Sequence, residues 1–269
     1  EEMNEAPLPY YDKYIYDKYF DGNPIPMNKL FPQAHIWSSR GCPFKCIFCV
    51  WPAAMTGNDP HGDGKRAVRQ YTPEYIDNLV KELTGRYKFK AIYFDDDTFN
   101  IGNRHTEKMS EVMSKFKIPW FAMCRADTSK KETWKTMSDS GCQGVKLGVE
   151  SGSQVVVDKI VNKHLDLKYV QEVVSYIRSL DMSVHGTFTY GLPGETKNDM
   201  IKTKRFIKET NFSTVQESGT AEIEGTPLHA LINEEKLTTY PGAIADENYD
   251  RQKDGGKKWQ SLVKELQNN

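Results

Sequence analysis

Three cysteines within a short stretch constrain this chain more than any other feature. Cys42, Cys46 and Cys49 follow the spacing C-x3-C-x2-C in residues 39–49. Thiolates this close in sequence can converge on one metal centre, and cysteine thiolates of this kind hold iron–sulfur clusters. An ordinary electron-transfer cluster takes four cysteines, so a set of three leaves one iron open to an outside ligand. We expect the chemistry of the protein at that open position.

The other two cysteines, Cys124 and Cys142, are scattered along the chain, and we expect both to be buried small residues. Three clustered and two scattered cysteines fit a reducing compartment with a metal site better than a secreted disulfide framework. The sequence therefore predicts a cytoplasmic protein. A zinc site remains open as an alternative, because His35 and His61 could complete a tetrahedral ligand set.

The charge balance excludes some classes of partner. Lys and Arg together number 36 and Asp and Glu 37, so no global field favours nucleic acid or an anionic membrane surface.

No apolar run approaches the roughly 20 residues of a membrane span, and no signal peptide opens the chain. The chain starts Glu1-Glu2-Met3, which is unusual for a natural protein, so we expect a piece of a longer one.

Strand-like and helix-like stretches alternate six times between residues 34 and 222. The expected strands are 34–38, 90–94, 119–124, 144–150, 182–190 and 213–222, and the expected helices are 73–85, 104–116, 129–140, 154–161, 167–180 and 199–210. This alternation predicts an α/β fold with a parallel sheet and helical crossovers, closed or partly closed. The expected first strand ends just before the cysteines, so it delivers the cysteine loop from its C-terminal end.

Three parts of the chain follow from this pattern. Residues 1–35 form a lead-in or linker, 36–230 the core, and 231–269 a C-terminal extension with a helix at 257–267. A polar loop at 51–70 is long for a compact domain, and such loops are often lids or binding segments.

Three motifs in one order resemble the radical S-adenosylmethionine (SAM) superfamily. The cysteine motif follows the first strand, residues 148–152 (GVESG) end the fourth, and residues 191–195 (GLPGE) end the fifth. The resemblance covers about residues 36–230 and implies a partial (βα)6 radical SAM barrel with short N- and C-terminal extensions. Residues 39–44 (SRGCPF) and 96–99 (DDTF) look like the branch whose members often carry a cobalamin-binding domain before this core.

The resemblance also implies roles for individual residues. Cys42, Cys46 and Cys49 would bind a [4Fe–4S] cluster, and SAM would occupy its fourth iron. The residues expected to contact SAM are Phe48, Asp96, Asp97, Arg125, Glu150, Ser151, Lys163 and Gly191. Taken by themselves, the acids after the second strand could instead bind a substrate cation or a neighbouring loop, and Arg125 could form a plain ion pair.

The expected function is reductive cleavage of SAM to a 5′-deoxyadenosyl radical that acts on an unactivated carbon. Methyl transfer or ring formation with cobalamin is expected if an upstream domain exists. The resemblance further implies a small-molecule or lipid-like substrate and an electron donor such as flavodoxin or ferredoxin. From the charge balance we expect no nucleic acid. Two alternatives stay open: a radical SAM methylthiotransferase, and a non-catalytic zinc-binding interaction scaffold. The substrate, the catalytic acids or bases and the oligomeric state are not specified by the sequence.

Overall fold

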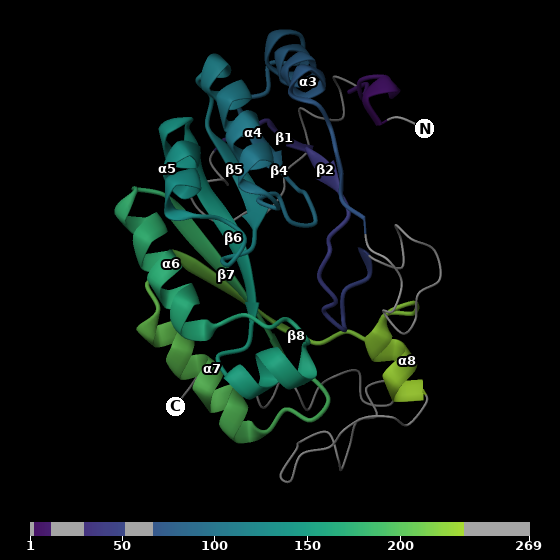
Figure 1. The fold of residues 1–269 in the computed structure, drawn as a ribbon, viewed down its shortest axis with the longest axis vertical. Coiled ribbons are helices and arrows are strands. Elements are labelled where there is room, and N and C mark those ends of the chain that lie inside the picture. Colours follow the sequence, from purple (N-terminus) through teal and green to yellow (C-terminus); the bar gives the residue numbers. More distant parts are fainter. Residues whose placement is uncertain (1–2, 12–29, 52–66, 234–269) are drawn as a thin grey trace. The chain divides into compact units, whose positions relative to one another are not determined.

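The structure is a computed structural model that describes residues 3–11, 30–51 and 67–233 (Figure 1). The expected C-terminal helix at 257–267, His61 and most of the 51–70 loop lie outside these ranges. In the described ranges no helix is both long enough and apolar enough to cross a membrane.

Six parallel strands form one sheet in the order β1-β4-β5-β6-β7-β8. The strands are β1 Gln33–Ile36, β4 Ala91–Phe94, β5 Trp120–Cys124, β6 Cys142–Glu150, β7 Ser183–Tyr190 and β8 Thr214–Gly219. The order follows the sequence, as expected when each strand is joined to its neighbour by a helical crossover. The prediction of a partial barrel built from six strand–helix units is confirmed.

The helices that join successive strands of the sheet match the predicted positions closely. They are α3 Pro73–Gly85, α4 Asn103–Phe116, α5 Lys131–Asp139, the π-helix Val156–Ile160, α6 Leu167–Ser179 and α7 Lys197–Glu209. Two further helices were not predicted: η1 Met3–Glu5 before β1 and α8 Pro227–Asn233 after β8. The start of α3 shows the local cause: the Thr72 side chain accepts a hydrogen bond from the Tyr75 amide, and Pro73 occupies the first turn.

The sequence patterns missed some short elements and mistook the type of one helix. A short antiparallel pair, β2 Ser39–Arg40 with β3 Arg69–Gln70, flanks the start of the cysteine loop. The stretch expected as an α-helix at 154–161 is in part a π-helix, and α8 lies where the helical periodicity had weakened. Strands of two residues and a single turn of π-helix leave too little periodic signal to be read from sequence.

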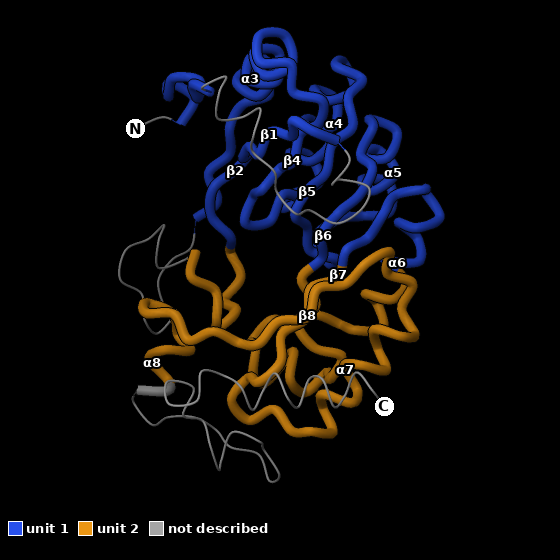
Figure 2. The backbone as a smooth tube through the Cα atoms, turned by 180° about the vertical axis from the view of Figure 1, so that it is seen from behind, with its two compact units in different colours: residues 1–42, 67–147, 173–185 blue, residues 43–66, 148–172, 186–269 orange. Residues whose placement is uncertain are grey.

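The chain divides into two compact units, coloured separately in Figure 2. Unit 1 comprises residues 1–42, 67–147 and 173–185, and unit 2 comprises 43–66, 148–172 and 186–269. This division does not coincide with the predicted lead-in, core and extension, whose boundaries stay a prediction.

Unit 1 is built on β1, β4 and β5 with α3 to α5. The parallel register places His35 beside Tyr93 and Tyr93 beside Phe121. One aromatic cluster of Phe94, Phe99 and Trp120 has ring centroids 4.8–5.6 Å apart and is fully buried. Rings at such separations stabilise beyond their buried area, so this cluster gives β4 and β5 a rigid support.

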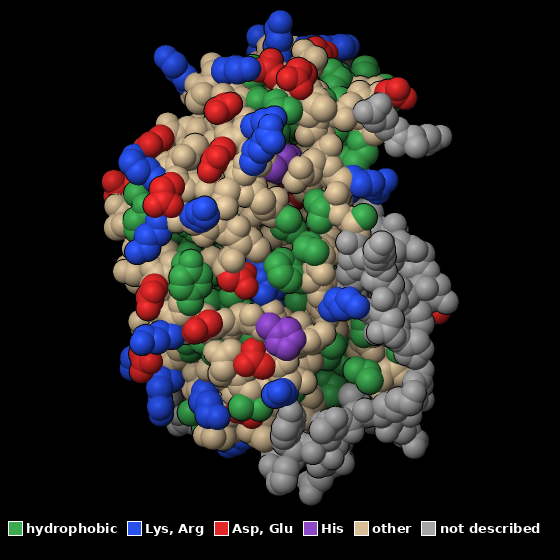
Figure 3. Space-filling model, in the orientation of Figure 1, with side chains coloured by type: hydrophobic (Ala, Val, Ile, Leu, Met, Phe, Trp, Pro, Cys, Tyr) green, Lys and Arg blue, Asp and Glu red, His purple; other side chains and the backbone are tan. Residues whose placement is uncertain are grey.

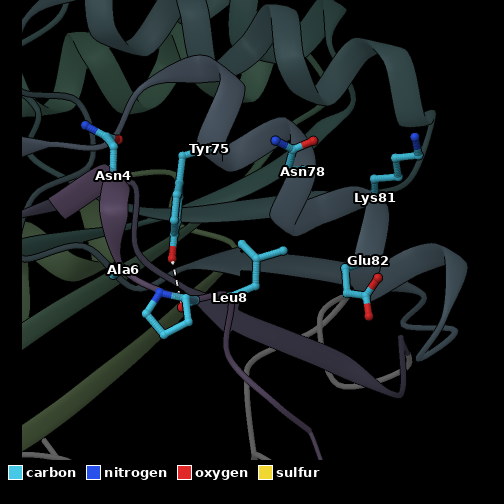
Figure 4. A pocket seen from close by; sticks show the side chains of 8 residues that line it. Asn4, Ala6, Leu8, Tyr75, Asn78, Lys81 and Glu82 are labelled. Atoms are coloured by element: carbon cyan, nitrogen blue, oxygen red, sulfur yellow. Dashed lines mark hydrogen bonds between the residues drawn. The ribbon is translucent and has the colours of Figure 1, made fainter.

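A groove in unit 1 separates the N-terminal segment from α3 and has a volume of about 510 Å³ (Figure 4). Tyr75 of α3 points toward that segment, and its hydroxyl lies 3.5 Å from the Pro7 carbonyl oxygen. The Asn4 side chain accepts a hydrogen bond of 2.7 Å from the Thr72 amide. These contacts attach the described start of the lead-in to the helix.

Unit 2 contains the π-helix, α7, α8 and β8. The first turn of α7 is closed by a reciprocal capping box between Thr196 and Asp199. Phe188, Phe206 and Phe212 pack around the same helix with centroids 5.6–6.4 Å apart. The helix therefore has both a fixed start and a fixed apolar face.

The face drawn in Figure 3 carries basic and acidic side chains interspersed, with no extended area of one sign. This agrees with the formal net charge of −1. On this face the charge distribution gives no electrostatic reason to expect a polyanionic partner.

Candidate functional site

The three cysteines of the motif lie in two units: Cys42 in unit 1, Cys46 and Cys49 in unit 2. All three are half-buried thiols. Within the described ranges, no three His, Cys, Asp or Glu side chains are already grouped closely enough to hold a metal ion.

In unit 1, the acidic run after β4 supports the start of the cysteine loop. Asp96 is buried and accepts hydrogen bonds from the Ser38 amide (3.0 Å), the Ser38 hydroxyl (2.8 Å) and the Ser39 hydroxyl (2.6 Å). Burial raises the pKa of Asp96 to about 6, although these hydrogen bonds oppose the rise. The Ser38 hydroxyl also lies 3.0 Å from His105 Nε2, and burial lowers the pKa of that imidazole to about 4.

Asp97 and Thr98, the next two residues, contact Gly41 and Cys42 respectively. Asp97 Oδ2 accepts a hydrogen bond of 2.8 Å from the Gly41 amide, and Thr98 Oγ1 lies 3.5 Å from Cys42 Sγ. Gly41 has φ of +95°, and a Cβ at this position would lie 2.2 Å from the Ala67 carbonyl oxygen. Only glycine fits both conditions, so the backbone before Cys42 is closely fixed.

Arg125 follows β5 and is buried. Its guanidinium donates two hydrogen bonds to Asp127, at 2.5 and 3.0 Å, in a bidentate pair. Asn100 brackets the Arg125 backbone: its Oδ1 accepts from the amide at 2.9 Å, and its Nδ2 donates to the carbonyl at 2.8 Å. The ion pair that the sequence left open is thus present, and a contact with SAM stays a prediction.

In unit 2, the second part of the cysteine loop packs on an apolar cluster. Cys46, Ile47 and Phe48 contact a buried group formed by Val156, Ile160, Val161 and Leu192. The Ile47 amide donates to the Val161 carbonyl at 3.1 Å, and the Ile47 carbonyl accepts from the Leu228 amide at 2.9 Å. Phe48 thus packs against a cluster that includes Leu192, the residue after Gly191, and a contact of Phe48 or Gly191 with SAM stays a prediction.

A buried ion pair joins two of the predicted SAM-binding residues. Lys163 Nζ lies 2.8 Å from Glu150 Oε1, with both side chains about nine-tenths buried. Gly148 makes room for the pair, since a Cβ there would lie 2.6 Å from Glu150 Oε1 and 2.8 Å from Lys163 Nζ. Glu150 itself has φ of +74°, and the residues on either side of Lys163 also have positive φ. Backbone held in this strained region is over-determined by its surroundings and is common at functional sites.

Ser151 and Gly191 have structural partners of their own. The buried Ser151 hydroxyl lies 3.0 Å from Thr203 Oγ1 of α7. Gly191 has φ of +78°, and its amide donates to Glu195 Oε2 at 2.7 Å. The Leu192 amide donates to the same oxygen at 3.3 Å, and burial raises the pKa of Glu195 to about 8. These bonds fix the turn that follows β7.

The sequence did not identify the side chains that bond to the predicted site residues and their loops. The sequence motif at 96–99 included Thr98 but gave no reason to single it out. Asn162, whose side chain donates to the Lys45 carbonyl at 3.1 Å, and Thr203 carried no signal in the sequence. Contacts of this kind span 52 to 117 residues, so only the tertiary fold shows them.

Comparison with known proteins identifies the family. The family model described as "Radical SAM superfamily" matches residues 38–207, which is more than half of the chain. The chain belongs to the radical SAM superfamily. Enzymes of this superfamily use a [4Fe–4S] cluster and SAM. The sequence-based identification of the superfamily is confirmed.

Two curated relatives of this radical SAM chain are methyltransferases. Cytidylyl-2-hydroxyethylphosphonate methyltransferase of Streptomyces wedmorensis is 26% identical over 242 residues, which cover 84% of this chain and 43% of the relative. An uncharacterized methyltransferase of Pyrococcus horikoshii is 28% identical over 243 residues, which cover 88% of this chain and 49% of the relative. The chain thus spans less than half the length of these relatives.

The fold is also that of a solved radical SAM methyltransferase. TsrM from Kitasatospora setae, whose structure holds cobalamin and a [4Fe–4S] cluster, superimposes with a TM-score of 0.65 at 16% sequence identity. The match covers 78% of this chain and 38% of TsrM. At this identity the likeness establishes the fold.

The residues present fit a cluster by the chemistry of their donors. Iron–sulfur clusters take thiolate ligands, and the motif supplies three half-buried thiols in a loop whose ends are fixed in both units. By contrast, burial raises the pKa of Cys142 to about 12 and the pKa of Cys124 well above its usual range. A thiol that resists ionisation is a poor metal ligand, so the two scattered cysteines do not fit that role.

Proposed function

We propose that this chain is the radical SAM core of a methyltransferase that binds a [4Fe–4S] cluster through Cys42, Cys46 and Cys49. The observation that carries the proposal is the three-thiol motif, which lies within the residues matched by the family model in a chain with methyltransferase relatives. When bound, the cluster supplies one electron to the sulfonium of SAM, which breaks a carbon–sulfur bond and leaves methionine and a 5′-deoxyadenosyl radical. Cobalamin, bound by a part of the protein outside this chain, would carry the methyl group.

The chain's own residues then bind and orient SAM. Phe48 and the turn at Gly191 present an apolar face suited to adenine, supported by the shared cluster that includes Leu192. Glu150 and Lys163 present one carboxylate and one ammonium, which match the amino and carboxylate groups of a methionine moiety. SAM would exchange the internal ion pair for two pairs with the ligand, so the site is charge-balanced whether empty or filled.

The remaining features of the proposal concern the surroundings of the reaction. A one-electron donor such as flavodoxin or ferredoxin would reduce the cluster, and a reducing, cytoplasmic compartment would keep the thiols available. The substrate would be a small molecule, and the radical would act on one of its unactivated carbons.

The test begins with anaerobic reconstitution of the chain with iron and sulfide. We expect about four irons per chain, a brown chromophore, and 5′-deoxyadenosine formed from SAM after reduction. Replacing Cys42, Cys46 and Cys49 together with alanine abolishes all three results, whereas Cys142→Ala retains them as the matched control. A tightly held zinc ion without SAM cleavage would refute the proposal in favour of a scaffold, and a sulfur-containing product on an added acceptor would favour a methylthiotransferase.

A further inference from the structure

A hydroxyl in unit 1 lies directly beside the first cysteine of the motif. Thr98 Oγ1 is 3.5 Å from Cys42 Sγ, and Thr98 is 6% exposed. The same hydroxyl donates a hydrogen bond of 2.6 Å to the Asp97 carbonyl oxygen. The Thr98 hydroxyl therefore has two neighbouring atoms that can each accept a hydrogen bond from it: the Cys42 sulfur and the Asp97 carbonyl oxygen.

The protons on Cys42 Sγ and Thr98 Oγ1 decide which of these two atoms donates the hydrogen bond between them. A threonine hydroxyl has one proton to donate and can accept as well. While Cys42 is a thiol, its S–H can donate to Thr98 Oγ1 and the hydroxyl can donate to Asp97 at the same time. A metal-bound thiolate has no proton, so its contact with Thr98 is attractive only if the hydroxyl turns its own proton toward the sulfur.

The turn of the hydroxyl is favourable because the acceptor is then charged. Hydrogen bonds to ionised acceptors are roughly twice as strong as those between neutral groups. The neighbouring residues also keep Thr98 Oγ1 close to Cys42 Sγ. The Asp97 carboxylate accepts a hydrogen bond from the Gly41 amide at 2.8 Å, and Gly41 packs closely against the Ala67 carbonyl. Rotation about one side-chain bond, without backbone movement, is enough to reverse the hydrogen bond.

We propose that Thr98 donates a hydrogen bond to the metal-bound sulfur of Cys42 and thereby raises the reduction potential of the cluster. This inference rests on the proposed function. Hydrogen bonds to cluster sulfurs are among the factors that set the potential, because they stabilise the more negative, reduced state. In the reaction concerned, one electron passes from an added reductant to the cluster, which goes from [4Fe–4S]2+ to [4Fe–4S]+, and no bond or proton is exchanged. Thr98 is thus a positioning residue that acts through Cys42 and stabilises the reduced state of the cluster.

The test is an EPR-monitored redox titration of the reconstituted full chain with dithionite. Thr98→Val keeps the shape of the side chain and removes the hydroxyl, and Thr98→Ser keeps the hydroxyl. At the wild-type midpoint we expect the ratio of reduced to oxidised cluster to fall about tenfold in Thr98→Val, which is about 59 mV for one electron. Thr98→Ser should titrate close to the wild type.

The matched control is Thr84→Val, since the Thr84 hydroxyl donates to the Val80 carbonyl at 2.8 Å within α3, outside the cysteine loop. It should leave the potential unchanged. A wild-type potential in Thr98→Val, or a Thr98→Ser variant that behaves like Thr98→Val, would overturn the inference.

Two further outcomes are separable. If Thr98→Val and Thr98→Ala both fail to load a cluster while Thr98→Ser loads one, the hydroxyl is required at the sulfur and the hydrogen bond is supported. A wild-type chain that loads no cluster refutes the proposed function itself, whereas a loaded wild type whose potential Thr98→Val does not move refutes this inference alone.

Discussion

Replacing Glu195 with glutamine should make the stability of the protein less dependent on pH. The Glu195 side chain is fully buried, and Oε2 accepts from the Gly191 and Leu192 amides. Oε1 is buried as well and has no hydrogen-bond partner among the described residues. Burial raises the pKa of Glu195 from about 4.5 to about 8, so the folded protein keeps this carboxyl protonated at neutral pH.

The sign follows from which state binds the proton. Because the pKa is raised in the folded state, the stabilisation is fully present below pH 4.5 and is lost as pH rises toward 8. Each unit of pH in that window costs about 1.4 kcal/mol, so the free energy of unfolding falls by about 3 kcal/mol between pH 4.5 and pH 7 through this group. Glutamine offers one oxygen to the two amides and cannot ionise, so Glu195→Gln lacks this loss.

The assay is urea unfolding of wild type and Glu195→Gln at several pH values from 4.5 to 8. Between pH 4.5 and pH 7, the free energy of unfolding of Glu195→Gln should rise by about 3 kcal/mol relative to that of the wild type. Glu209→Gln, an exposed change of the same kind at the opposite end of α7, is the matched control. A pH-independent difference for Glu195→Gln would mean that Glu195 is ionised in the folded protein and would refute the reasoning.

Two other changes test contacts of the site. Lys163→Met should lower the free energy of unfolding by about 3–5 kcal/mol in urea, because Glu150 is left as a buried unpaired charge. The double variant with Glu150→Gln should recover most of that loss, and failure to recover would mean that the two residues are not coupled. Gly41→Ala should reduce thermal stability because its Cβ meets the Ala67 carbonyl, whereas Gly85→Ala, with open space around it, should not. Equal melting temperatures for the two glycine variants would contradict this reading.

The sequence predicted the fold well because its signals are local and repeated. Six units of strand and helix each carry apolar periodicity and, in places, a cap such as Thr72 with Pro73. The order of strands then follows because a helical crossover joins each strand to the next one along the chain. The β2–β3 pair has no comparable repeat and was missed, and the helix predicted at 154–161 is in part a π-helix.

The site was predictable only to the level of its motif. Spacing identified Cys42 as a ligand candidate, and the strand-end position placed carboxylates near it. The sequence could not show that Asp96 accepts from two serines or that Asp97 accepts from Gly41, because these contacts depend on how β1 and β4 pair. A run of three acids leaves their directions undetermined until the register of that pairing is known.

The parallel pairing of β1 with β4 has a consequence for the timing of synthesis. The anchor of the cysteine loop, from Ser38 to Asp96, spans 58 residues, and the Lys45–Asn162 bond spans 117. At translation rates of about 5–20 residues per second, the thiols leave the ribosome roughly 3–12 s before the first anchor exists and roughly 6–23 s before the second. During that interval the loop lacks both anchors. If the three thiols bind a cluster as proposed, the site that holds it would be complete only after most of the domain has been synthesised.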